Sequence, residues 1–93
     1  MKHYKLQDPI FQRDIRLVVN VPLEDVCQWI EREFGERFTV GAARGFYFWL
    51  VSDESEVHIV WVDEYDGSAE SNQTLAHEIL HLAIGVLRSD GLS

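Results

Sequence analysis

His77 and His81 stand four residues apart in the sequence, and Glu78 directly follows the first histidine. This is the pattern H-E-x-x-H, in which two imidazoles lie about one turn apart on the same side of an α-helix. Neutral imidazole nitrogens are common zinc ligands, and at this spacing two of them can share one small cation. The pattern therefore predicts a zinc site with His77 and His81 as metal ligands. The alternative is a plain surface helix whose polar residues are hydrogen-bonded at a groove.

The same pattern predicts a chemical role for Glu78, which does not bind the metal in this arrangement. A catalytic zinc ion lowers the pKa of its water towards about 7, and a neighbouring carboxylate then takes up the proton. The resulting nucleophile attacks a carbonyl group that the metal also polarises. We expect Glu78 to be the catalytic base, and hydrolysis of a peptide bond to be the reaction.

The third zinc ligand is not evident from the spacing, although a catalytic zinc site usually has three protein ligands. One class of zinc peptidases is excluded, because Leu87 occupies the place of its third histidine. Asp90 is the nearest downstream carboxylate, but a surface acid at the end of a helix is the more ordinary interpretation. The other candidates, none with a distinctive spacing, are Asp63, Glu64, Asp66, Glu70 and His58.

The elements that must position these residues follow from the pattern of apolar side chains. A β-branched run predicts a strand near 14–20, and helical spacing after Pro22 predicts an amphipathic helix over 22–34. Two further runs predict strands over 46–51 and 57–62, joined by a hairpin turn and paired antiparallel. The last helix, capped by Ser68 or Ser71, should run over 72–88 and carry the metal site. The order β-α-β-β-α predicts an α+β fold with a short antiparallel sheet and two helices.

The predicted last helix is apolar on nearly every side. Its core stripe, opposite the two histidines, should consist of Leu75, Ile79, Leu82 and Val86. The residues that flank the histidine face are Leu80, Ile84 and Leu87. Because one small sheet and one other helix cannot cover all sides, we expect a further element here. This element is either a segment downstream of Ser93 or a neighbouring subunit. We expect residues 1–93 to form a single domain, which a downstream segment would complete.

Three blocks of sequence resemble a known family. They are Trp29–Gly35, Val57–Val62 and Thr74–His81. The chain resembles, over residues 22–91, the small zincin-like metallopeptidases encoded in bacteriophages and prophages. The resemblance implies a helix before a short sheet, a polar loop leading to the H-E-x-x-H helix, and a later helix whose glutamate completes the metal site. That later helix has no counterpart here, and position by position His77 and His81 correspond to metal ligands and Glu78 to the catalytic base.

Composition narrows the classes of partner. Eight basic and sixteen acidic residues give a formal net charge of −8, which repels nucleic acid. No apolar run is long enough to cross a membrane. Cys27 is the only cysteine, and we expect it to pack on the apolar face of the first helix. We expect a soluble protein of a reducing cytosol or of a particle assembled there, and the resemblance implies the bacterial cytoplasm or a phage particle.

Three functions remain open from the sequence. The first is a phage-type zinc-dependent metallopeptidase that acts on a peptide or protein, which the strand over 57–62 would bind along an exposed edge. The aromatic residues of the strands are expected to form the core, although they could line a peptide groove. The second is a catalytically inactive, zincin-like component of a virion or its assembly. The third is an acidic inhibitor that binds a host protein through its negative charge.

Overall fold

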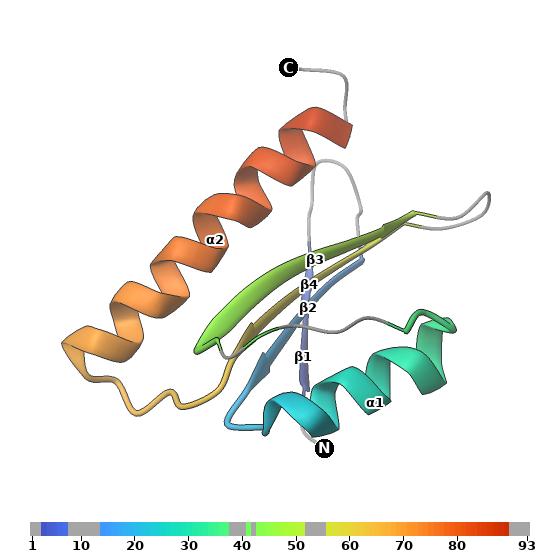
Figure 1. The fold of residues 1–93 in the computed structure, drawn as a ribbon. Coiled ribbons are helices and arrows are strands. Elements are labelled where there is room, and N and C mark those ends of the chain that lie inside the picture. The colour runs from blue at the N-terminus through green and yellow to red at the C-terminus, as the bar shows by residue number, and fades with distance from the viewer. Residues whose placement is uncertain (1–2, 8–13, 38–40, 42, 52–55, 90–93) are drawn as a thin grey trace.

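The fold is that of a computed structural model, which describes residues 3–7, 14–37, 41, 43–51 and 56–89. In chain order its elements are β1 (His3–Gln7), β2 (Asp14–Val19), α1 (Leu23–Phe34), β3 (Gly45–Val51), β4 (Glu56–Val62) and α2 (Ala69–Ser89). The strands form one sheet in the order β1-β2-β4-β3, and α1 and α2 cover opposite faces of it (Figure 1). The predicted α+β class is confirmed.

The sheet differs from the predicted one in two respects: it has an additional strand, and one of its pairs is parallel. β1 is a strand that the sequence pattern did not reveal, and it pairs antiparallel with β2. β2 and β4 run parallel, with Leu17 beside Val60, so the sheet is mixed. Parallel neighbours need a crossover, and the chain between them contains α1 and β3. The predicted antiparallel pairing of β3 with β4 is confirmed, while the turn at 52–55 lies outside the described residues.

β4 is an inner strand and not an edge, so the expectation that residues 57–62 offer an open edge to a substrate is wrong. It is paired with β2 on one side and with β3 on the other. Every residue from 57 to 62 is buried. A strand covered on both faces has a continuous apolar run, which does not by itself distinguish an inner strand from an edge. In the described part of the sheet, the outer positions belong to β1 and β3.

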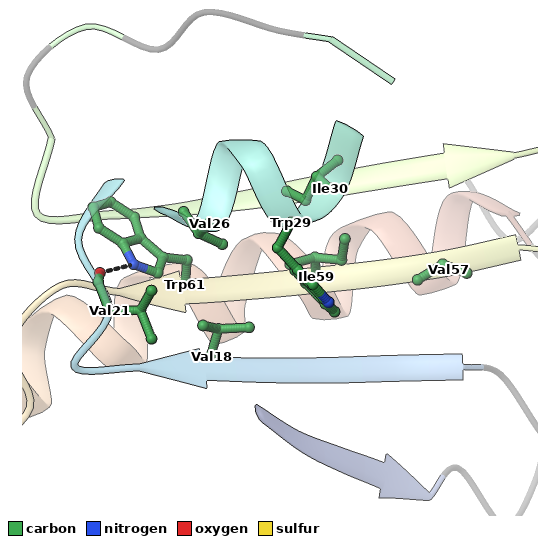
Figure 2. Close-up of a cluster of buried hydrophobic side chains, with 8 residues drawn as sticks. All are labelled: Val18, Val21, Val26, Trp29, Ile30, Val57, Ile59 and Trp61. Atoms are coloured by element: carbon green, nitrogen blue, oxygen red, sulfur yellow. Dashed lines mark hydrogen bonds between the residues drawn. The ribbon is translucent and has the colours of Figure 1, made fainter. Parts of the chain in front are cut away.

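One face of the sheet packs against α1. Figure 2 shows this cluster: Val18, Val21, Val26, Trp29, Ile30, Val57, Ile59 and Trp61. The indole Nε1 of Trp61 donates a hydrogen bond of 2.7 Å to the carbonyl oxygen of Val21, which ties β4 to the start of α1. Trp29 of α1 and Trp61 of β4 therefore belong to the core, which confirms the expectation for Trp61, whereas Trp49 of β3 was expected in the core and is 39% exposed. Cys27 of α1 is only half-buried, and desolvation raises the pKa of its thiol.

The other face packs against α2. Its cluster contains Ile15, Val60 and Leu82, with Leu17, Tyr47, Leu75 and Val86 around them. Three members of the predicted helix stripe are therefore confirmed, but Ile79 is 38% exposed and is not part of the core. The physical reason is the rotation of α2, which turns Glu78 and Gly85 towards the sheet. No helix among the described residues has the length and apolar character needed to cross a membrane.

Two glycines allow α2 to approach β3 closely. A Cβ on Gly45 would lie 3.0 Å from Cγ2 of Thr74 and 3.2 Å from Cγ of Glu78. A Cβ on Gly85 would overlap the hydroxyl of Tyr47. That hydroxyl is 2.6 Å from Nδ1 of His58, which is fully buried, so the tyrosine ring is held in place below the helix. The contact between α2 and β3 thus depends on the absence of a side chain at both glycines.

Replacing Gly85 by alanine tests this contact. Alanine favours a helix over glycine by about 1 kcal/mol, but here its methyl group must displace a hydrogen-bonded tyrosine. We expect Gly85→Ala to lower the free energy of unfolding by about 1–3 kcal/mol in urea denaturation. Gly41→Ala is the matched control, because nothing lies within 4 Å of the added Cβ. Equal stability of the two variants would contradict the packing described.

Candidate metal centre

The candidate centre lies on α2, whose N-terminus is fixed by side-chain hydrogen bonds. The backbone N–H of Ser71 donates to Oγ of Ser68 at 3.2 Å, so Ser68 is the capping residue. Oδ1 of Asp66 accepts from the N–H of Ser68 at 2.9 Å and from the hydroxyl of Ser71 at 3.0 Å. These bonds satisfy donors that the first turn of a helix leaves open. They let α2 begin at Ala69, three residues before the predicted start.

The rotation of α2 buries Glu78 against the sheet and leaves the two histidines exposed. Thr74 and Glu78 approach Gly45 of β3, whereas Leu82 and Val86 pack in the cluster with Ile15 of β2. With about 100° per residue, this places His77 and His81 on the side of α2 that lies beyond β3. Both histidines are exposed, and Glu78 is 7% exposed between helix and sheet.

The two imidazoles converge. Their Nε2 atoms are 3.1 Å apart, the ring centroids are 4.6 Å apart, and the ring planes are 84° from each other. In a tetrahedral site with bonds of about 2.0–2.1 Å, two ligand nitrogens are separated by roughly 3.3–3.4 Å. A shift of a few tenths of an ångström therefore admits a cation. The same separation also suits a hydrogen bond between two neutral imidazoles, with one ring as donor and the other as acceptor.

Glu78 completes a compact group. One ligand atom from each of His77, Glu78 and His81 lies within 4.8 Å of the other two. Within the described residues, no hydrogen bond or ion pair engages the Glu78 carboxylate, although the side chain is almost entirely buried. The donor set is two imidazole nitrogens and one carboxylate oxygen. The residues present therefore fit a small cation with nitrogen ligands, and zinc has this preference.

None of the described candidates for a third ligand joins this group. His58 is buried in β4, where it is stacked between the rings of Tyr47 and Trp49 at centroid distances of 5.9 and 5.8 Å. The acidic candidates Asp63, Glu64, Asp66 and Glu70 line a hollow of about 370 Å³ at the N-terminus of α2. Asp90 lies outside the described residues. The described part of the chain thus supplies two imidazoles and one carboxylate.

Acidic residues that line this hollow are paired with neighbouring protein groups. Arg44 forms an ion pair with Glu70, and Ser68, Ser71 and Thr74 also line it. The hydrogen bonds from Ser68 and Ser71 lower the pKa of Asp66 to about 2. Asp66 therefore supports the cap of α2 through its bonds to Ser68 and Ser71, which explains its position without a role as a metal ligand.

The sequence did not reveal the residues that orient α2 over β3. Tyr47 and His58 are on neighbouring strands, in diagonal positions that come together only when the sheet forms, and Gly85 meets Tyr47 only when the helix docks. The close contact of Gly45 with Thr74 and Glu78 depends on the same docking. A glycine within an otherwise helical run was the one available signal, since such residues often mark a close approach.

No protein family, curated protein or solved structure that was compared matches this chain. The candidate centre therefore rests on its own geometry, and the resemblance to phage zincin-like peptidases remains a prediction.

The shifted pKa of Asp66 predicts how stability varies with acid. A carboxylate whose folded pKa lies below its unfolded value of about 3.9 stabilises the fold above that value, and this contribution is lost as pH falls through about 2. We expect Asp66→Asn, which keeps an acceptor but cannot ionise, to lose less stability than the wild type between pH 4 and pH 2. Urea unfolding of both proteins across this range is the measurement. Parallel losses in the two proteins would contradict the role of Asp66 as an ionised cap.

Proposed function

We propose that this protein is a zinc-dependent hydrolase of peptide bonds. The observation that carries the proposal is the convergence of the two Nε2 atoms to 3.1 Å, with a carboxylate oxygen of Glu78 within 4.8 Å of a ring nitrogen of each histidine. Two nitrogen ligands beside a buried carboxylate are the donor set expected for metal-assisted hydrolysis. The resemblance of Thr74–His81 to phage zincin-like metallopeptidases supports the same activity, and the bacterial cytoplasm or a phage particle as its location.

The residues have separate roles in this proposal. His77 and His81 hold the metal, which when bound acts as a Lewis acid towards the carbonyl group and the attacking water. Glu78 accepts a proton from that water at a carboxylate oxygen and passes it to the amine that leaves. The reaction then consumes one water and yields one carboxylic acid and one amine. The Cγ of Glu78 lies close to Gly45, so packing restricts the part of the side chain that carries the carboxylate.

The substrate in this proposal is an extended peptide, which the outer edge of β3 would bind. Among the described strands, β3 pairs only with β4, so its other edge offers backbone groups. The histidines lie on the same side of α2 as this edge, as the contacts of Thr74, Glu78 and Gly85 with β3 indicate. An extended chain added there would run past the metal site through main-chain hydrogen bonds.

Substitution of the three residues separates binding from chemistry. We expect His77→Ala to weaken zinc binding by more than about 100-fold, because one of two nitrogen ligands is lost. We expect Glu78→Gln to keep zinc but to slow peptide hydrolysis by about 100- to 10,000-fold. Isothermal titration with zinc and turnover of a peptide library are the two measurements.

Gln73→Ala is the matched control, because Gln73 is exposed on the same helix one turn before His77. It should change neither zinc binding nor turnover. Failure of the wild-type protein to bind zinc at saturating concentration would reject the proposal, and so would hydrolysis that survives in Glu78→Gln.

A second candidate function is a catalytically inactive, zincin-like component of a virion or its assembly. The observation that favours it is the outer surface of α2, where Leu80, Ile84 and Leu87 are 59%, 41% and 47% exposed. Exposed apolar side chains gathered on one helix are typical of protein interfaces. Zinc binding without turnover would favour this candidate over the hydrolase.

A further inference from the structure

We infer that a metal ion joins two copies of this chain through α2, with His77 and His81 of each copy as its four ligands. The inference uses the metal binding of the proposed function but not its hydrolysis. The described residues provide two imidazole ligands, whereas zinc in a closed site takes four ligands in a tetrahedron. A second copy related by a two-fold axis offers the two nitrogens that are missing.

The charged residues of α2 are placed symmetrically about its histidines. Glu70 and Arg88 lie nine residues before and nine residues after Ile79, and His77 and His81 lie two before and two after it. In a two-fold pair, each residue contacts the residue that contacts it in return. If two antiparallel α2 helices meet through this face, with the two-fold axis at the axial level of Ile79, His77 faces His81 of the second copy and Glu70 faces Arg88 of the second copy. Opposite charges therefore meet at both ends of the metal site.

These four residues also share one face of the helix. The step from Glu70 to His77, and from His81 to Arg88, is seven residues, which is almost two complete turns. The step from His77 to His81 is four residues, slightly more than one turn. All four side chains are exposed. A second helix that docks on this face can therefore meet all of them together.

The outer edge of β3 supports the same arrangement. β3 is seven residues long, contains no charged residue or proline, and is the edge strand beyond which the histidines lie. Such an edge is suited to pairing with another chain. Strands are spaced about 4.8 Å apart, and α2 packs across both β3 and β4. If the sheet continues from β3 into β3 of the second copy, the two α2 helices lie about 9–10 Å apart, within the usual range for packed helices.

The pairing also accounts for part of the exposed apolar surface. Ile84 is three residues after His81 and lies beside the histidine face, where a second helix would cover it. Its 41% exposure should therefore fall when the two copies associate. Four imidazoles leave no open coordination position, so the pair is a closed state in which the proposed hydrolysis cannot proceed.

Sedimentation of the full chain with zinc, and with a chelator in place of zinc, tests the inference. We expect a dimer with one zinc per two chains, and a monomer when zinc is removed. His77→Ala should remain monomeric in both conditions. A zinc-loaded monomer at tens of micromolar protein would overturn the inference, and so would a dimer that persists in the chelator or in His77→Ala.

Charge reversal tests the antiparallel arrangement. Glu70→Arg turns two attractive contacts into repulsive ones, and we expect it to weaken the zinc-dependent dimer about tenfold. Arg88→Glu should have a similar effect, and the double variant should recover the wild-type dissociation constant. Glu70 also pairs with Arg44 in a single copy, but such an exposed pair is weak and its loss is common to both Glu70 variants. No recovery in the double variant would overturn this register.

Glu78→Gln distinguishes this inference from the proposed hydrolysis, because it removes the base and leaves all four histidines. It should dimerise with zinc as the wild type does, and a dimer that depended on Glu78 would contradict the four-histidine site. A zinc dimer whose zinc-bound monomer, obtained by dilution, also cleaves no peptide would leave this inference standing and reject the hydrolase. A zinc-dependent peptidase that stays monomeric would do the reverse.

Discussion

The close approach of α2 to β3 is the contact on which the candidate site depends. Gly45 below the helix and Gly85 within it remove the side chains that would hold the two elements apart. The hydroxyl of Tyr47, hydrogen-bonded to the buried His58, then fills the space that Gly85 leaves. Because α2 is fixed in rotation as well as in distance, Glu78 enters the interior and the two histidines stay outside. A rotation of one residue would bury an imidazole and expose the carboxylate.

The local parts of the fold were predictable because their causes are local. The convergence of His77 and His81 follows from the pitch of a helix, so the sequence pattern predicted it without knowledge of the sheet. The strands at 46–51 and 57–62 and both helices were likewise indicated by side-chain periodicity, to within a few residues. The extra turn at the start of α2 was missed because the sequence offers both Ser68 and Ser71 as capping residues. The hydrogen bonds that select Ser68 are seen only in the structure.

The parts that were not predicted depend on contacts between distant segments. The parallel pairing of β2 with β4 is decided by the crossover through α1, and no short-range pattern reports it. Ile79 satisfies the helical spacing of a core residue, yet it is displaced from the core because the two glycines set the rotation of α2. A third metal ligand is equally hard to predict from the sequence, because it would come from another element. Sequence spacing can suggest such a residue but cannot show that it lies close to the two histidines in the fold.

Hydrolysis and metal-bridged pairing make opposite demands on the same two nitrogens. A hydrolytic centre needs an open coordination position beside Glu78, whereas four imidazoles close the coordination sphere. The two proposals also exclude each other at the outer edge of β3, which would pair either with a substrate chain or with β3 of a second copy. Pairing is second order in the protein, so its share rises with concentration, whereas capture of a peptide depends on the peptide. One surface can therefore serve both states, with the amount of protein and substrate deciding between them.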